Sequence, residues 1–113
     1  MAPIVFRRGD VVHLDFDPQS GREMKGNHYA LVISNDLFNK SGMCMVCPIT
    51  QGSYHRDGGF TTTLMGTGMD TQGVVVASEA KILDLVARKA RFKERCDEYV
   101  TEEVLAKVCA ILS

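Results

Sequence analysis

Short stretches of the chain alternate between apolar and polar side chains. Over residues 10–16, Val12, Leu14 and Phe16 would share one face of an extended segment, and His13 would lie on the other. Alternation with a period of two is typical of a strand buried on one face only. We therefore predict a half-buried strand over 10–16, with His13 at the surface.

Several later stretches are rich in apolar and β-branched residues and are bounded by glycine and polar clusters, which is typical of strands. They lie at 28–34, 43–49, 60–64, 73–78 and 81–85. The stretch over 43–49 is largely apolar, so we expect it in the centre of a sheet. A single helical turn that stops at Gly42 is predicted over 35–42.

The C-terminal segment has helical spacing instead. Thr101 is a favourable helix-capping residue and two acidic residues follow it, so we predict that a helix begins there. Its apolar face would hold Val104, Leu105, Val108, Ile111 and Leu112. For residues 88–99 we predict a last strand. Short strands followed by one terminal helix predict a mainly β fold, a small antiparallel barrel with a C-terminal helix.

Length and composition fit one globular domain that spans residues 1–113. Hydrophobic residues make up 45% of the chain and charged residues 24%, which argues against disorder. The 13 basic and 14 acidic residues give a net charge of −1. A protein that tracks along duplex nucleic acid needs many phosphate contacts, so near-neutrality argues against that class. A local basic patch is still allowed.

The N-terminal residues favour a cytoplasmic protein. The charged Arg7 and Arg8 follow a short apolar run, whereas a secretory signal has the reverse order. The chain has no apolar run long enough to cross a bilayer, so no membrane association is expected. In the cytoplasm we expect reduced cysteines.

Cys44 and Cys47 form a C-x-x-C motif. A structural zinc site needs a second close pair of ligands, and neither the cysteines nor the histidines have that spacing. Strand alternation would also send these two thiols to opposite faces of the sheet. We therefore interpret them as core residues, and expect no metal and no cofactor.

Two long loops are predicted over 17–26 and 51–59, where glycine and polar residues gather. Residues suited to acid–base chemistry and anion binding lie around these loops. They are Arg22, Glu23, Lys25 and His28 near the first loop, and Thr50, Gln51, Tyr54, His55 and Arg56 near the second. Cleavage of RNA without a metal ion needs a base, an acid and donors to the charged phosphorane. Histidine can move either proton, and arginine, lysine and threonine can bind phosphate oxygens.

Plainer interpretations exist for the same residues. Arg22 and its neighbours fit a solvated loop, His28 fits a strand-edge histidine bonded to backbone, and Thr50 fits an ordinary strand residue. Tyr54 and Phe60 could stack on unpaired bases. Aromatic residues more often serve packing.

A series of short motifs resembles the MazF/PemK toxin family. In order along the chain they are Arg8-Gly9-Asp10-Val11-Val12, Phe16-Asp17-Pro18, Gly21-x-Glu23-x-x-Gly26, Ala30-Leu31-Val32-Ile33-Ser34, Phe38-Asn39, Val46-Cys47-Pro48-Ile49-Thr50, Gly59-Phe60 and Gly73-Val74-Val75. The resemblance implies an SH3-like barrel that works as a homodimer. It also implies a toxin of a type II toxin–antitoxin system that cleaves single-stranded mRNA, leaving 2′,3′-cyclic phosphate and 5′-hydroxyl ends. The implied antitoxin partner would cover the RNA groove with an acidic, extended tail.

The resemblance also indicates roles for individual residues. Thr50 aligns with the family's active-site threonine, whereas His28-Tyr29 stands where the family usually has Arg-Pro. Some members use an arginine and an aspartate at the positions of Val76 and Ser78, so that version of the mechanism is not available here.

The working hypothesis makes His28 the proton-transfer residue. Thr50, with Arg22 or Lys25, would stabilise the phosphorane, and Glu23 would share the proton chemistry or orient Arg22. The segment 51–60, which includes Gln51, Tyr54, His55, Arg56 and Phe60, would contact the RNA and select bases.

Three alternatives remain open from the sequence. One is a non-catalytic toxin of the same barrel that inhibits DNA gyrase. Another is a degenerate family member that binds antitoxin or RNA without cutting. The third is a generic SH3-like interaction module, for which a chain with no tryptophan and three tyrosines is poorly equipped.

Overall fold

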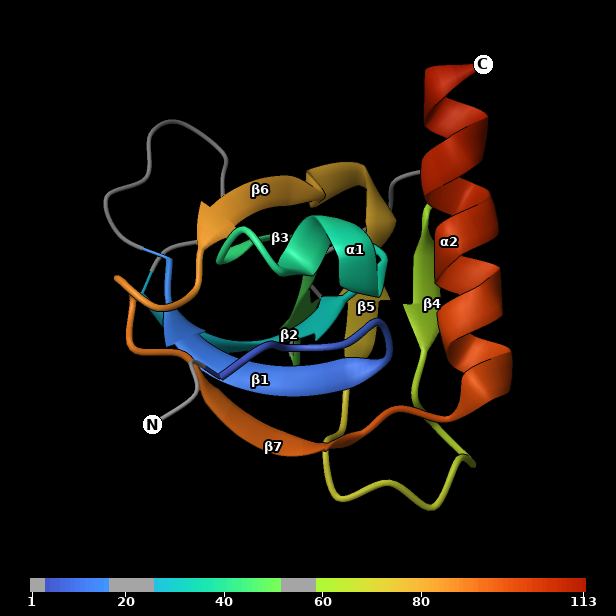
Figure 1. Ribbon diagram of the computed structural model, residues 1–113. Helices are drawn as coiled ribbons and strands as arrows, with labels where there is room; N and C mark the ends of the chain where they lie inside the picture. The colour runs from blue at the N-terminus through green and yellow to red at the C-terminus, as the bar shows by residue number, and fades with distance from the viewer. Residues whose placement is uncertain (1–3, 17–25, 52–58) are drawn as a thin grey trace.

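A computed structural model describes residues 4–16, 26–51 and 59–113 (Figure 1). The elements follow one another as β1 (Asp10–Asp15), β2 (Asn27–Val32), α1 (Asp36–Asn39), β3 (Met43–Thr50), β4 (Thr61–Thr63), β5 (Val74–Val76), the 3-10 turn η1 (Ala77–Glu79), β6 (Lys81–Asp84), β7 (Arg91–Arg95) and α2 (Glu98–Leu112). Each predicted strand is present with slightly different ends. The stretches that the sequence patterns predicted as strands are therefore strands in the structure.

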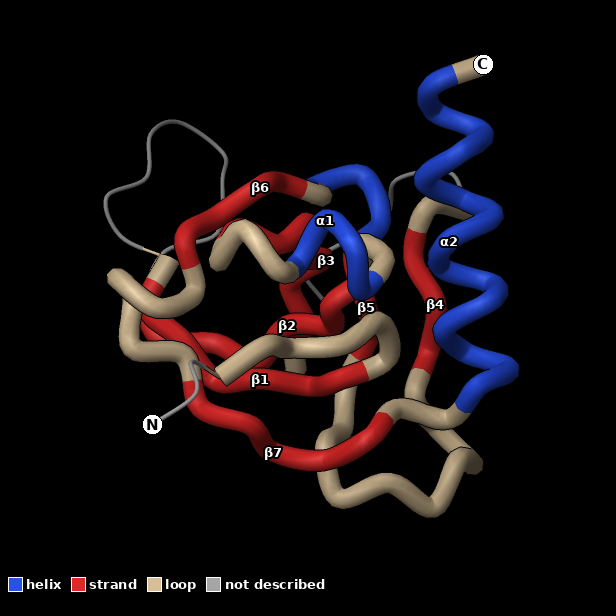
Figure 2. The backbone as a smooth tube through the Cα atoms, viewed as in Figure 1, coloured by secondary structure: helices blue, strands red, loops and turns tan. Residues whose placement is uncertain are grey.

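The strands form one antiparallel seven-stranded sheet in the order β4-β5-β3-β2-β1-β7, with β6 paired to β3 outside this path. The central position predicted for β3 is confirmed, since β3 pairs with β2, β5 and β6. Figure 2 shows the sheet curling around itself into a barrel-like shape. Among the described strands the barrel does not close, because β4 and β7 end the path without pairing with each other and β6 pairs with β3 alone.

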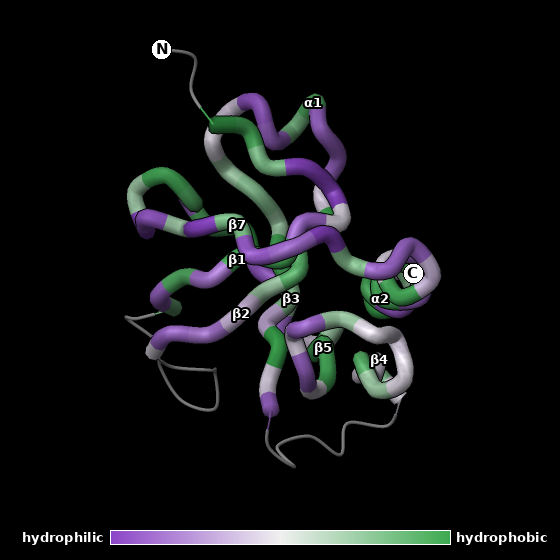
Figure 3. Tube along the Cα trace, turned by 90° about the horizontal axis from the view of Figure 1, so that it is seen from below, coloured by the Kyte–Doolittle hydropathy of each residue, from purple (hydrophilic) through white to green (hydrophobic). Residues whose placement is uncertain are grey.

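The sheet has a hydrophobic cluster on each face. Val12, Leu14 and Phe16 belong to the cluster inside the curl, as their alternation predicted. Val11 belongs to the other cluster, which α2 helps to cover. The view in Figure 3 shows β5 and β4 following β3 towards α2. In this arrangement, β1, β2 and β3 lie farther from α2 than β4 does.

Helix α2 begins at Glu98, so the predicted start at Thr101 is wrong by three residues. The side chain of Asp97 accepts a hydrogen bond from the Tyr99 N–H at 2.8 Å and caps the helix. Aspartate is as good a cap as threonine, and the earlier start buries Val100 against the sheet. Lys107 then ties the helix to β4, donating to the Thr61 carbonyl at 2.7 Å.

The apolar face of α2 is shorter than the sequence predicted. Val104 and Val108 are buried, but Ile111 is 46% exposed and Leu112 is 78% exposed. Figure 1 shows the reason, because the last turns of α2 project beyond the end of β4. Within the described residues, no helix is long and apolar enough to cross a bilayer.

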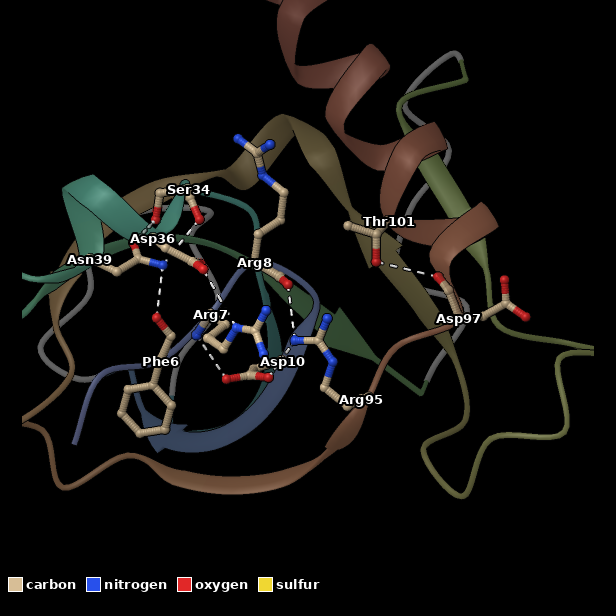
Figure 4. A network of polar contacts seen from close by, with 10 residues as sticks. All are labelled: Phe6, Arg7, Arg8, Asp10, Ser34, Asp36, Asn39, Arg95, Asp97 and Thr101. Atoms are coloured by element: carbon tan, nitrogen blue, oxygen red, sulfur yellow. Dashed lines mark hydrogen bonds and ion pairs between the residues drawn. The ribbon is translucent and has the colours of Figure 1, made fainter.

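The N-terminal motif Arg8-Gly9-Asp10 anchors β7 to the start of the sheet (Figure 4). Asp10 is 5% exposed, and its carboxylate accepts from the Arg95 guanidinium at 2.7 Å and from the Arg7 N–H at 2.8 Å. Arg95 also donates to the Arg8 carbonyl at 3.0 Å. The strand predicted over 88–99 is therefore confirmed only for Arg91–Arg95, since a turn precedes it and α2 follows.

Glu94 of β7 holds the loop between β4 and β5. Its carboxylate accepts from the Thr71 hydroxyl at 2.5 Å and the Thr71 N–H at 2.7 Å, and from the Asp70 N–H at 3.3 Å. Burial alone would raise the pKa of Glu94, but these hydrogen bonds outweigh it and lower the pKa below its usual value. Glu94 therefore stabilises the fold as a carboxylate.

We expect Glu94→Gln to lower the free energy of unfolding by about 1–2 kcal/mol at neutral pH, because an ionised acceptor is replaced by a neutral one. A carboxyl whose pKa is lowered on folding contributes stability above its unfolded pKa, near 4.3 for glutamate, and loses it as pH falls through the folded value. The difference between wild type and variant should therefore narrow below about pH 4. Urea unfolding at several pH values measures it, with Glu102→Gln on the exposed side of α2 as the control. A difference that stays constant down to pH 3 would contradict this role.

Candidate active site

A pocket of about 360 Å³ opens where the C-terminal ends of β1 and β3 lie beside the N-terminal end of β2. Its lining residues are His13, Asn27, His28, Tyr29, Ile49, Thr50 and Gln51. The volume lies within the range of small-molecule sites in proteins. The pocket brings together His28, Thr50 and Gln51, three of the residues that the sequence singled out.

The pairing of β2 with β3 explains why His28 and Thr50 are neighbours. Tyr29 lies opposite Ile49 and Ala30 opposite Pro48, so the same register places His28 beside Thr50. Directly opposed residues on one face have Cβ atoms about 4.5–5.5 Å apart. The His28 ring meets the buried Phe16 ring edge-on, with centroids 6.2 Å apart, which orients it from the inner side of the sheet.

Thr50 is positioned from its other side by β5. It pairs with Val74 and is only 6% exposed. Gly73, just before β5, packs directly on the Thr50 backbone, because a Cβ added at Gly73 would lie 2.2 Å from the Thr50 carbonyl oxygen. The Gly73-Val74-Val75 motif therefore sets the position of Thr50 as well as forming a strand.

His13 and Tyr29 form the opposite wall of the pocket. They are paired across β1 and β2, and their rings meet at 62° with centroids 5.1 Å apart. The alternation in the sequence predicts His13 at the surface, and no sequence motif indicates a role for Tyr29. Only the cross-strand pairing places them beside His28, and no local pattern in the sequence carries that information.

The other predicted residues are placed differently. Arg22, Glu23, Lys25, Tyr54, His55 and Arg56 lie outside the described residues. Phe60 lies next to Ala77, whose N–H donates to the Phe60 carbonyl at 2.8 Å. Phe60 therefore lies at the opposite end of β4 from Thr63. Thr63 is the end nearer to Thr50, because both residues pair with Val74. Phe60 does not line the pocket.

Cys44 and Cys47 are buried core residues, as predicted. Cys44 and Cys47 belong to different hydrophobic clusters, which confirms that they face opposite sides of the sheet. Burial raises the pKa of Cys47 to about 12 and that of Cys44 to about 11, where a hydrogen bond with Ser34 opposes the rise. Both thiols therefore remain protonated near neutral pH, a poor state for metal binding. The described residues contain no group of three or more potential metal ligands.

The pocket combines a histidine, a threonine hydroxyl and an amide, Gln51, within one concave site. An imidazole exchanges protons near neutral pH, and a hydroxyl can donate to a developing negative charge. Val76, the position at which the resemblance implies an arginine in some family members, is fully buried in the core. Among the described residues of the pocket, histidine is therefore the side-chain type best suited to proton transfer near neutral pH.

Comparison with known proteins gives a consistent picture. The family described as PemK-like, MazF-like toxin of type II toxin-antitoxin system matches residues 7–112. The endoribonuclease toxin ChpB of Escherichia coli strain K12 is 40% identical over 109 residues, which cover 95% of this chain and 94% of ChpB. A crystal structure of MazF from Deinococcus radiodurans superposes with a TM-score of 0.87 at 32% identity, covering 97% of this chain and 98% of that one. A MazE-MazF crystal structure from the same organism has a TM-score of 0.80 at 31% identity, covering 96% of this chain and 97% of that one.

Proposed function

This chain belongs to the PemK-like, MazF-like toxins of type II toxin–antitoxin systems, and on that premise we propose that it cleaves single-stranded mRNA at specific sequences. The observation that carries the proposal is the placement of His28 and Thr50 in one pocket at the end of β2 and β3. The curated relatives named as endoribonucleases support the same activity.

The proposed reaction uses the RNA's own 2′-hydroxyl as nucleophile and needs no metal ion. The 2′-oxygen attacks the adjacent phosphorus as a base takes its proton, and the bond to the 5′-oxygen breaks as that oxygen gains a proton. The products are a 2′,3′-cyclic phosphate and a 5′-hydroxyl. His28 carries one of these protons, and Thr50 donates to a non-bridging oxygen of the phosphorane.

Further groups in the proposal come from the two segments outside the described residues. Arg22 or Lys25 would add positive charge next to the phosphorane, and Glu23 would share the proton transfer or orient Arg22. Gln51 already lines the pocket and would contact the RNA together with Tyr54, His55 and Arg56.

We also propose an antitoxin partner, a homodimeric state and a cytoplasmic location. The similarity to a MazE-MazF complex supports a protein partner. An acidic, extended antitoxin tail would suit a surface that binds phosphates, because both ligands are anionic.

Incubation of the wild-type protein with a long single-stranded RNA in EDTA tests the activity. We expect cuts at a short recurring sequence, with cyclic phosphate and 5′-hydroxyl ends, and far less cutting of the same RNA when annealed into a duplex. RNA that stays intact while the expressed protein still arrests growth would overturn the nuclease and favour inhibition by binding.

A further inference from the structure

One continuous row of paired residues crosses the outer face of the sheet at the level of the pocket. In order from edge to edge it consists of Thr62, Val75, Ile49, Tyr29, His13 and Arg91. Residues paired in this way present their side chains on the same face of the sheet. The row therefore joins the catalytic pocket to the edge strand β7.

Burial changes along this row. Thr62, Val75 and Ile49 are buried beside α2, Tyr29 and His13 are partly exposed, and Arg91 is exposed. The helix covers the far part of the row, since its contacts are with β4 and η1. The end that carries Tyr29, His13 and Arg91 is thus the part of this face that opens towards the pocket.

Tyr29 and His13 form an aromatic pair within the pocket wall. In an edge-to-face pair at 62°, the ring that contributes its edge keeps both faces clear of its partner. Aromatic rings that are partly open to solvent, as those of Tyr29 and His13 are, can stack on unpaired nucleobases, and nearby cations can bind the neighbouring phosphates. Arg91 lies opposite His13 across β1 and β7, and supplies such a cation.

We propose that Tyr29 and His13 form a subsite that stacks one nucleobase of the RNA beside the cleaved bond, and that Arg91 binds a phosphate next to that base. The subsite rests on the proposed nuclease function and adds a binding role for residues outside the proton-transfer and phosphorane contacts. Stacking tolerates any base, so this subsite would anchor the strand, and base selection would lie elsewhere.

The test uses a short RNA that contains one cleavage site mapped with the wild-type protein. Each nucleotide near the cut is replaced in turn by an abasic one, and kcat/KM is measured for the wild type and Tyr29→Leu. At one position, the abasic change should lower wild-type kcat/KM about tenfold. On the intact RNA, Tyr29→Leu should have a kcat/KM about tenfold below that of the wild type. The abasic change at that one position should not lower the kcat/KM of Tyr29→Leu further, whereas abasic changes at the other positions should lower it as much as they do for the wild type.

Tyr99→Leu on the exposed side of α2 is the matched control and should behave like wild type. Tyr29 also packs against the core, so the Tm of each variant is measured, and Tyr29→Phe should keep both the fold and the dependence on the stacked base. Should Tyr29→Leu fail to fold, His13→Gln measures the same coupling. If the loss from Tyr29→Leu and the loss from the abasic change multiply at every position, the subsite is overturned. Wild-type protein that cuts no RNA would overturn the proposed function instead.

The role proposed for Arg91 is tested by the salt dependence of RNA binding. Loss of one contact between a protein cation and a phosphate of a single strand makes the slope of log affinity against log salt shallower by about 0.7. We expect that reduction for Arg91→Gln and none for Lys40→Gln, which lies beyond the end of α1. An unchanged slope in Arg91→Gln would remove Arg91 from the subsite.

Discussion

Replacing His28 with glutamine is expected to lower kcat/KM for single-stranded RNA by about 10²–10⁴-fold, the usual contribution of a general acid or base. The side chain lines the pocket beside Thr50 and meets the Phe16 ring edge-on. Glutamine keeps a polar side chain of similar size in that place but cannot carry a proton near neutral pH. Gel-based cleavage of the mapped RNA measures the loss, and thermal unfolding shows whether the fold survives.

His28→Arg distinguishes two ways in which this position can work. Arginine restores the residue usual in the family and gives a permanent charge with bidentate contacts to phosphate. If His28 acts as a cation, His28→Arg should be active, and wild-type activity should be higher at acidic than at alkaline pH. If neutral His28 is the base, wild-type activity should be higher at alkaline pH and His28→Arg should stay low. Full activity in His28→Gln at every pH would exclude His28 from the chemistry.

Thr63→Ala provides a control for Thr50→Ala. Both residues pair with Val74, but Thr50 lines the pocket and Thr63 lies exposed on the edge strand β4. Loss of activity in Thr50→Ala alone would tie the effect to the hydroxyl in the pocket. Equal losses would indicate that both changes act through the strand.

Local patterns in the sequence were sufficient to predict the strands. Side chains alternate with a period of two in any strand, so Val12, Leu14 and Phe16 had to share a face, and they meet in one cluster. Strand pairing is not local, and the sequence carried no sign that His13 would lie between Tyr29 and Arg91. The wall of the pocket formed by His13 and Tyr29 was therefore missed.

The ends of α2 show the same limit in a different form. Asp97 and Thr101 are both acceptable caps, and burial of Val100 against the sheet decides between them. At the other end, Ile111 and Leu112 keep the helical spacing of the core face but are exposed, because the last turns of α2 project beyond the end of β4. Periodicity describes one element, whereas burial depends on where its neighbours stop.

His28 and Thr50 were brought forward by resemblance to a family more than by any pattern of their own. Histidine at a strand end and threonine in a strand are common without any catalytic role. The structure places the two residues in one pocket, and their catalytic roles stay a prediction for the variants above to test. The cations Arg22, Lys25 and Arg56, which the same hypothesis uses, lie outside the described residues.

Gly73→Ala is expected to lower the free energy of unfolding by roughly 2–5 kcal/mol, through backbone strain together with overpacking. Gly73 has a φ of +114°, a conformation that residues with a side chain rarely adopt. The added methyl group would also overlap the Thr50 carbonyl oxygen at 2.2 Å. Backbone has to move to relieve that contact, because the atoms nearest to the added Cβ are backbone atoms of Thr50 and Gln51.

Because the displaced backbone is that of Thr50, Gly73→Ala should also reduce cleavage in the fraction of protein that remains folded. Gly68→Ala in the same loop is the matched control: φ is +78°, but no atom lies within 4 Å of the added Cβ. It carries only the cost of the backbone conformation, about 1 kcal/mol, and should cut RNA normally. Urea unfolding and cleavage per folded molecule measure the two variants side by side. A larger loss of both quantities in Gly73→Ala assigns the difference to its contact with Thr50, whereas equal losses would show that Gly73 serves the turn alone.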